Sequence, residues 1–148
     1  MTGVPRRLQR FFAAPSGRCL LLALDHGAAE GLTPGVARTP EILAGLAGRS
    51  AQAVVLHKGL ARAHVLDLPP AVQLVVQLSA GTKHGLPGYG QSLVCSVQEA
   101  ARLGADAVSL HVNIGNDLED RMLADLGAVT EEARLLGLPV LAVIYARG

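Results

Sequence analysis

Five short apolar runs recur along this 148-residue chain, each bounded by glycine, proline or polar residues. Uninterrupted apolar runs of this length are typical of strands that are buried on both faces of a parallel sheet. Amphipathic helical patterns fill most of the intervals, and such strand–helix alternation predicts a parallel sheet with right-handed crossovers. We expect strands at 19–25, 53–58, 72–78, 106–111 and 139–145.

Capping patterns place the helices between these strands. Thr39, which is followed by proline, predicts the N-cap of a helix that runs to about Arg49. Ser96 with Glu99 three residues later forms a capping box, and the helix that it opens is expected to stop at Gly104.

Three further segments complete the prediction. Asn116 is expected to cap a long helix that runs to Leu136. The segment 60–71 contains two consecutive prolines and is too short for a full helix. The glycine-rich segment 79–90 is expected to be a loop. Loops of this length in compact domains often bind ligands or close over them, and a mobile linker is the alternative.

Polar side chains follow four of the apolar runs at the same end. They are Asp25 and His26, His57 and Lys58, His111 and Asn113, and Tyr145. Barrel enzymes carry their active sites at the carboxyl ends of their strands. An open doubly wound sheet is a weaker match, because no dinucleotide-binding glycine fingerprint follows the first run. A complete barrel needs eight strands and about 250 residues. We therefore predict one α/β domain (1–148) that forms an incomplete (β/α)8 TIM barrel, with 1–17 as an N-terminal extension.

Composition limits the partners of this chain. The formal net charge is +1, and such a balance gives no electrostatic footprint for nucleic acid or for an anionic membrane. No apolar stretch approaches the roughly 20 residues of a membrane-spanning helix, and no signal-peptide pattern follows the arginine-rich start. Cys19 and Cys95 are too few for a disulfide framework and are expected to be buried thiols. We expect a cytoplasmic protein that binds neither nucleic acid nor membrane.

The residues at the strand ends suggest acid–base chemistry. Asp25 can act as a general acid or base or bind substrate hydroxyls, or it can cap the next turn. Tyr145 can donate a proton to a carbanion-like intermediate, or it can be an amphipathic core residue. His57, His111 and Asn113 are suited to position a polar substrate, and a purely structural role is the alternative for each.

Five segments together resemble one known family. They are 24–27, 55–59, 76–79, 104–115 and 139–148, in family order. On these segments the chain is similar to the archaeal-type class I fructose-bisphosphate aldolases and the related 2-amino-3,7-dideoxy-D-threo-hept-6-ulosonate synthases. The resemblance implies a TIM-barrel enzyme that makes or breaks carbon–carbon bonds of phosphorylated keto sugars through a lysine Schiff base, without a cofactor. The ending Tyr145–Gly148 has alanine where the family has proline.

By this resemblance, Asp25 is the acid–base carboxylate and Tyr145 is the proton donor. We assign substrate binding to His26, His57, Lys58, His111, Asn113 and Arg147. The family's Schiff-base lysine lies on the sixth strand and its phosphate-binding loops follow the last two strands, all beyond the five strands of this sequence. We therefore expect this chain to be inactive by itself.

Lysine is scarce in this chain, and a Schiff base requires a neutral amine. Lys58 and Lys83 are the lysines of the sequence, and Lys83 belongs to the solvated glycine-rich segment. Lys58 is better placed to be a displaced nucleophile, because it follows His57 and an apolar run. A cation at the rim that contacts substrate is the simpler interpretation of Lys58.

Two alternatives belong to other classes of function. One is a non-catalytic half-barrel that serves as a binding or assembly module. The other is a metal-dependent lyase, because His26, His57 and His111 come from different strands and can converge on a zinc ion. The prediction that we favour has no bound metal ion. A half-barrel also leaves unpaired edges at its first and last strands, and such edges favour pairing with another chain. We expect a homo-oligomer or a complementing chain.

Overall fold

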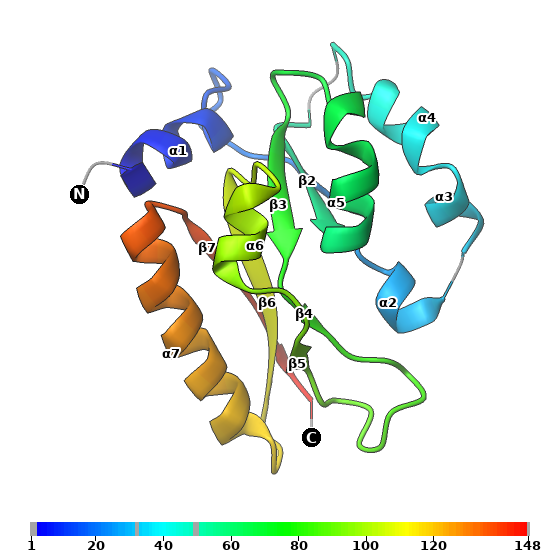
Figure 1. Cartoon of the computed structure of the whole chain (residues 1–148), viewed down its shortest axis with the longest axis vertical. Helices are drawn as coiled ribbons and strands as arrows, with labels where there is room; N and C mark the ends of the chain where they lie inside the picture. The colour runs from blue at the N-terminus through cyan, green and yellow to red at the C-terminus, as the bar shows by residue number, and fades with distance from the viewer. Residues whose placement is uncertain (1–2, 32, 49–50, 148) are drawn as a thin grey trace.

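The computed structural model describes residues 3–31, 33–48 and 51–147, and its centre is a sheet of five parallel strands. The strands lie side by side in chain order: β1 (Leu21–Ala23), β2 (Ala53–His57), β3 (Gln73–Gln77), β6 (Ala107–Ile114) and β7 (Val140–Ala146) (Figure 1). Each neighbouring pair is parallel. Sequential parallel strands joined by helices are the arrangement of a TIM barrel. The predicted fold class is confirmed: the chain is an incomplete TIM barrel.

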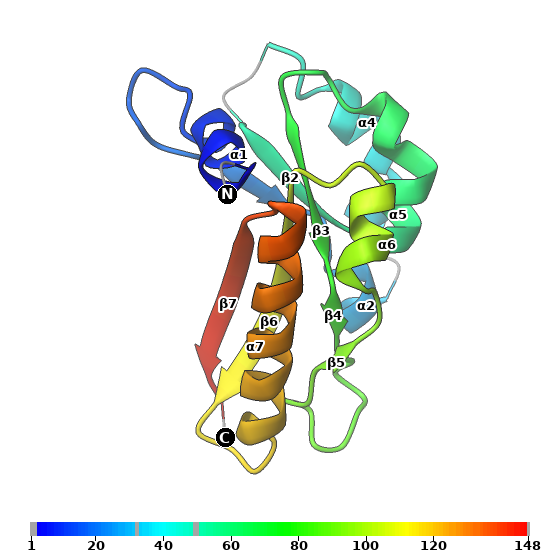
Figure 2. The ribbon, with the colours of Figure 1, turned by 60° about the vertical axis from the view of Figure 1, so that its left-hand side comes forward.

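Helices cover one face of this sheet. They are α4 (Thr39–Ala44), α5 (Lys58–His64), α6 (Val97–Arg102) and α7 (Glu119–Leu136) (Figure 1 and Figure 2). Alternate strand residues such as Val54, Leu56 and Val76 pack against buried side chains of these helices, among them Leu43 and Val129. The main hydrophobic core therefore lies between the sheet and its helices, which leaves the other face of the sheet to carry chemistry.

The helix α1 (Gly3–Phe11) lies against the other face, at the amino ends of the strands. Phe11 packs there with inward-facing strand residues that include Val55 and Val75. Arg7 of the same helix donates a hydrogen bond to the carbonyl of Gly137 at 2.8 Å. The segment 1–17, expected as an extension, thus contains a helix that covers the floor of the half-barrel.

The helix α4 is shorter than predicted. It begins near the expected residue but ends at Ala44, and Arg49 lies outside the described residues. The glycines that follow explain the early end, because Gly45 disfavours helix and Gly48 has a left-handed φ of 70°. The expectation of a helix to Arg49 was therefore wrong.

The helix α7 begins two residues later than predicted, at Glu119, with Leu118 in place of Asn116 at the N-cap. The Asn116 side-chain oxygen accepts a hydrogen bond from the Leu118 N–H at 3.0 Å, which makes a local turn ahead of the helix instead of a cap. The C-terminal end agrees with the sequence, because Gly137 adopts the left-handed conformation that stops the helix.

The segment 60–71 contains more helix than predicted. The helix α5 starts directly after β2, at a residue assigned to the strand, and the short 3-10 helix η1 (Val65–Asp67) follows it. Because α5 begins two residues before this segment, a helix of seven residues fits into it.

The predicted capping box is confirmed in its first half, since Ser96 Oγ accepts a hydrogen bond from the Glu99 N–H at 3.1 Å.

The segment 79–90 was predicted as a loop, but its first two residues form a strand of a small hairpin whose second strand follows the segment. β4 (Ser79–Ala80) pairs antiparallel with β5 (Ser92–Leu93), and residues 81–91 connect them. This connection, called the 81–91 loop below, extends past the carboxyl ends of the strands (Figure 1). The short helices α2 (Gly27–Glu30) and α3 (Pro34–Ala37) follow β1.

The strand β7 forms an open edge of the sheet. Within the described chain it pairs only with β6. Its side chains are exposed on both faces, with Leu141 38% and Ile144 52% exposed.

Among the described residues, no helix has both the length and the apolar character needed to cross a membrane.

Candidate active site

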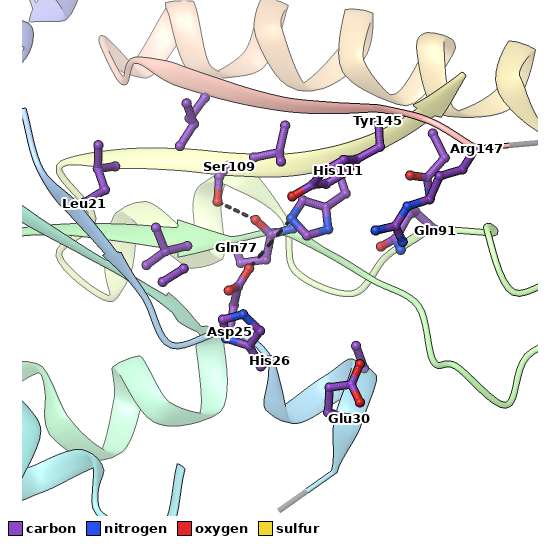
Figure 3. Close-up of a pocket in the computed structure, with 16 residues that line it drawn as sticks. Leu21, Asp25, His26, Glu30, Gln77, Gln91, Ser109, His111, Tyr145 and Arg147 are labelled. Carbon is purple, nitrogen blue, oxygen red and sulfur yellow. Dashed lines mark hydrogen bonds and ion pairs between the residues drawn. The ribbon is translucent and has the colours of Figure 1, made fainter. Parts of the chain in front are cut away.

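A cavity of about 410 Å³ lies on the uncovered face of the sheet. All five strands contribute to its lining, as do α2 and the 81–91 loop. Six of the predicted site residues line it: Asp25, His26, His111, Asn113, Tyr145 and Arg147. Figure 3 labels all of them except Asn113. The structure thus brings together residues that are up to 122 positions apart in the sequence, counted from Asp25 to Arg147 (147 − 25).

The alternation of side chains along a strand explains this convergence. Neighbouring residues of a strand point to opposite faces, so Ser109, His111 and Asn113 of β6 all line the cavity. The residues between them face the helices and are apolar. Asn113 is paired in register with Tyr145 of β7, which places these two side chains next to each other.

Asp25 and His111 face each other across the cavity. The distance from Asp25 Oδ2 to His111 Nε2 is 3.9 Å, and the Asp25 side chain is only 11% exposed. Burial lowers the pKa of His111 below its ordinary value, and the negative charge of Asp25 opposes that shift. A neutral imidazole beside a carboxylate can hold or pass a proton, so this pair is suited to acid–base chemistry.

Tyr145 is held between two other side chains at the same rim. The His111 ring meets the Tyr145 ring edge-on, with centroids 5.9 Å apart and an interplanar angle of 89°. The Arg147 guanidinium carbon lies 4.6 Å from the Tyr145 ring centroid. Arg147 is the only lysine or arginine among the cavity-lining residues of the described chain, so it is the group that would bind an anionic part of a ligand.

A buried polar network supports the floor of this site. Gln77 Nε2 donates to the Ser79 hydroxyl at 3.0 Å, and Ser109 donates its hydroxyl hydrogen to Gln77 Oε1. Ser79 Oγ also accepts from the His111 backbone N–H at 2.8 Å. Sequence reasoning missed Gln77 and Ser109 as cavity residues. The sequence signal for both residues was a polar side chain inside an otherwise apolar run. Such a side chain is informative because a buried polar group needs a hydrogen-bond partner.

His57 and His26 occupy different positions around Asp25. His26 lines the cavity. His57 does not line it, but it lies close enough to Asp25 to sense its charge and contacts the backbone carbonyls of Gln77 and Asp25. Burial lowers the pKa of His57, and the charge of Asp25 and these carbonyls oppose the shift. His57 is therefore placed to support Asp25 from outside the cavity.

Lys58 points away from the cavity. Its ammonium group pairs with Glu99 Oε2 at 3.2 Å, on the side of the sheet where the helices lie. Arg62 holds the other oxygen of the same carboxylate at 3.1 Å, and the hydrogen bond from Lys58 lowers the pKa of Glu99. The structure thus does not bring Lys58 to the other predicted site residues, because α5 begins there and turns the side chain outward.

The thiols and the histidines show no further reactive arrangement in the part of the chain that the structure describes. Cys19 and Cys95 are free thiols. Burial and the nearby Glu99 raise the pKa of Cys95 to about 11, which disfavours a thiolate nucleophile. The described histidine, cysteine, aspartate and glutamate side chains form no group of three that could hold a metal ion, so the metal-dependent alternative gains no support.

The fold and this site together define a class of protein: one side of a TIM barrel, with a carboxylate, an imidazole and a phenol gathered at the carboxyl ends of the strands. The family model of DeoC/LacD family aldolases matches residues 19–148. The chain belongs to this aldolase family.

Individual relatives agree with this assignment. The chain is 37% identical over 142 residues to the 2-amino-4,5-dihydroxy-6-oxo-7-(phosphonooxy)heptanoate synthase of Streptomyces griseus, covering 96% of this chain and 52% of the relative. It is 33% identical over 148 residues to the 2-amino-3,7-dideoxy-D-threo-hept-6-ulosonate synthase 1 of Archaeoglobus fulgidus, covering 100% of this chain and 55% of the relative. The chain spans about half the length of these curated relatives.

Solved structures show the same relationship. An archaeal fructose 1,6-bisphosphate aldolase superposes with a TM-score of 0.86 at 28% identity, covering 98% of this chain and 58% of that protein. An archaeal fructose-1,6-bisphosphate aldolase with its catalytic lysine bound to the carbinolamine intermediate superposes with a TM-score of 0.82, over the same shares of the two chains.

Proposed function

We propose that this chain supplies the acid–base side of a class I aldolase site that acts on phosphorylated keto sugars. The observation that carries the proposal is the cavity that gathers Asp25, His111 and Tyr145 at the strand ends. Membership of the aldolase family and the product named for the Streptomyces griseus relative, a keto compound with a phosphonooxy group, support this substrate class.

In the proposed reaction, the bond that breaks joins the carbon next to the carbonyl carbon to the following carbon, which carries a hydroxyl group. Asp25 takes the proton from the hydroxyl group on the carbon that leaves as an aldehyde. The electron pair of the broken bond stays with the fragment that carries the carbonyl function, where a Schiff base would accept it. Tyr145 then gives a proton to the carbon next to the carbonyl carbon, which lost its bond to the leaving aldehyde. Arg147, His26 and His111 bind the charged and hydroxyl groups of the substrate, and His57 holds Asp25 in place from outside the cavity.

We assign to this chain the residues that transfer protons. We do not assign to it the lysine amine that forms the Schiff base. Neither lysine of the described chain lines the cavity. Lys58 pairs with Glu99 on the helix side, and Lys83 pairs with Glu30 at 3.1 Å with both side chains about half exposed. An amine paired on the helix side of the sheet, or in an exposed loop, is not in position to attack a carbonyl group in the cavity.

Carbon–carbon cleavage of fructose 1,6-bisphosphate tests this proposal, and it is measured on this chain together with a complementing polypeptide that supplies the amine. We expect Asp25→Asn and Tyr145→Phe each to lower kcat by about 100-fold or more, because each removes a group that moves a proton. Cys19→Ser, away from the strand ends, is the control. A wild-type protein that cleaves no keto sugar phosphate, or Asp25→Asn and Tyr145→Phe variants at full rate, would overturn the proposal.

The binding and assembly alternative is favoured by one observation, the exposed apolar strand β7. We propose that another copy of the chain or a complementing polypeptide covers this edge, since unpaired apolar strands associate. A cytoplasmic location fits small phosphorylated substrates and stays part of the proposal.

A further inference from the structure

The side chain of Asn113 is buried with one unpartnered oxygen. The residue is 2% exposed, and its Nδ2 donates to the backbone carbonyl of Tyr89 at 2.6 Å. Because a carbonyl oxygen can only accept, this contact fixes which end of the amide is the NH2 group. The other end, Oδ1, is shielded from water and has no hydrogen-bond partner among the described residues.

A buried acceptor without a donor is unusual in a folded protein, because it has lost its hydrogen bonds to water and gained nothing. In the described chain, one other buried side-chain atom shares this condition, Oε1 of Glu132. Glu132 lies on the helix side, whereas Asn113 lines the cavity of the proposed active site. A ligand in that cavity is therefore in position to supply the donor that Asn113 lacks.

The same amide also holds the 81–91 loop. Besides the contact of its carbonyl with Asn113, Tyr89 donates its hydroxyl hydrogen to Asp117 Oδ1 at 2.5 Å. Lys83, at the other end of the loop, pairs with Glu30 on the opposite rim of the cavity at 3.1 Å. The loop thus runs from one rim to the other, and the Asn113 amide connects it to the floor of the site.

We propose that Asn113 Oδ1 binds a hydroxyl group of the substrate, and that this contact secures the 81–91 loop over the occupied site. The two polar groups of the amide then have different roles. The NH2 group holds the loop through the Tyr89 carbonyl, and the oxygen accepts a hydrogen bond from the substrate hydroxyl group. A small movement of the loop admits the hydroxyl group, and the new hydrogen bond removes the cost of the unpartnered oxygen. The inference rests on the proposed function for its ligand, a hydroxylated keto phosphate.

Such a site discriminates against ligands that lack the hydroxyl. An analogue with a methyl group at that position leaves the buried oxygen unpartnered, and sites built around a hydrogen bond reject such analogues strongly. Dihydroxyacetone phosphate and acetol phosphate form a matched pair of probes, since they differ only in a hydroxymethyl group replaced by a methyl group.

Endoproteinase Lys-C gives a readout that requires no turnover. Lys58 and Lys83 are the lysines of the chain; Lys58 starts α5 and Lys83 lies in the loop, so cleavage after Lys83 reports opening of the loop. We expect dihydroxyacetone phosphate, at about ten times its Kd, to slow this cleavage about tenfold. Acetol phosphate at the same concentration should slow it about twofold, because its affinity is about tenfold lower.

Three variants separate the two tasks of the amide. Asn113→Leu should speed cleavage without ligand about fivefold and abolish the preference for the hydroxylated probe. Asn113→Asp should also loosen the loop but keep the preference, because a carboxylate still accepts from a hydroxyl. Tyr89→Phe, which removes only the contact with Asp117, should loosen the loop and keep the preference. Circular dichroism verifies that each variant is folded.

Equal slowing of wild-type cleavage by both probes, or slowing by neither, would overturn the inference. A preference that survives in Asn113→Leu would do the same. The outcome is independent of the aldolase assay: hydroxyl-dependent protection without carbon–carbon cleavage would reject the proposed function alone, and cleavage without such protection would reject this inference alone.

Discussion

The Arg147 guanidinium carbon lies 4.6 Å from the centroid of the Tyr145 ring, a cation–π contact at the open edge of the sheet. Tyr145 is 44% exposed, so little else restrains its ring on that side. Cation–π contacts at exposed sites contribute about 0.5–1 kcal/mol, enough to favour one ring orientation. The positive charge beside the phenol makes Arg147 a positioning residue for the proposed proton donor.

Replacing Arg147 should therefore disturb Tyr145 in a way that depends on charge. The chain has two tyrosines and no tryptophan, so Tyr145 is the only tyrosine in a Tyr89→Phe background. In this background we expect Arg147→Met to weaken the near-ultraviolet circular dichroism of Tyr145, and Arg147→Lys to preserve most of the signal. Identical spectra for the two variants would show that the cation does not orient the ring.

The buried histidines should make stability depend on pH. Burial lowers the pKa values of His57 and His111 below the ordinary 6.5. The unfolded chain therefore takes up these protons first as the pH falls, so stability is full above pH 6.5 and is lost below it. We expect the urea midpoint of the wild type to fall between about pH 7.5 and about pH 5.5. His111→Asn should show a smaller fall, whereas a matched change in the exposed loop, His84→Asn, should retain the wild-type fall.

Lys58 should not form a Schiff base, because its ammonium group is paired with Glu99 on the helix side of the sheet. Borohydride trapping with dihydroxyacetone phosphate or fructose 1,6-bisphosphate, read by intact mass, checks this directly. We expect no adduct on Lys58, and Lys58→Met should leave the binding of either compound unchanged. An adduct that Lys58→Met removes would assign the covalent step to this residue.

The exposed strand β7 should drive self-association of the isolated chain. Ile144 is 52% exposed on this strand, and an unpaired apolar edge is a template for pairing. Sedimentation velocity should show a concentration-dependent assembly that Ile144→Lys weakens. Leu66→Lys is the control, because Leu66 is 95% exposed but lies in η1, away from the edge. A strictly monomeric wild type would contradict this expectation.

The strand and helix pattern could be predicted because it depends on local rules. Continuous apolar runs located all five strands of the sheet, and Ser96 and Gly137 marked a helix start and a helix end where the structure has them. The boundaries that failed, at Thr39–Arg49 and Asn116, failed where glycines or a side-chain turn competed with the helix pattern.

The sequence by itself determined the class of fold and the strands, since these depend on hydrophobic period. It also named eight site residues, and the structure shows that six of them share the cavity. Only the tertiary structure decided the direction of Lys58, the position of His57 outside the cavity, and the unpartnered oxygen of Asn113. Each depends on contacts between segments far apart in the chain, such as Lys58 with Glu99 and Asn113 with Tyr89. Local sequence patterns do not predict such contacts, because the contacts form only when the folded sheet brings these segments together.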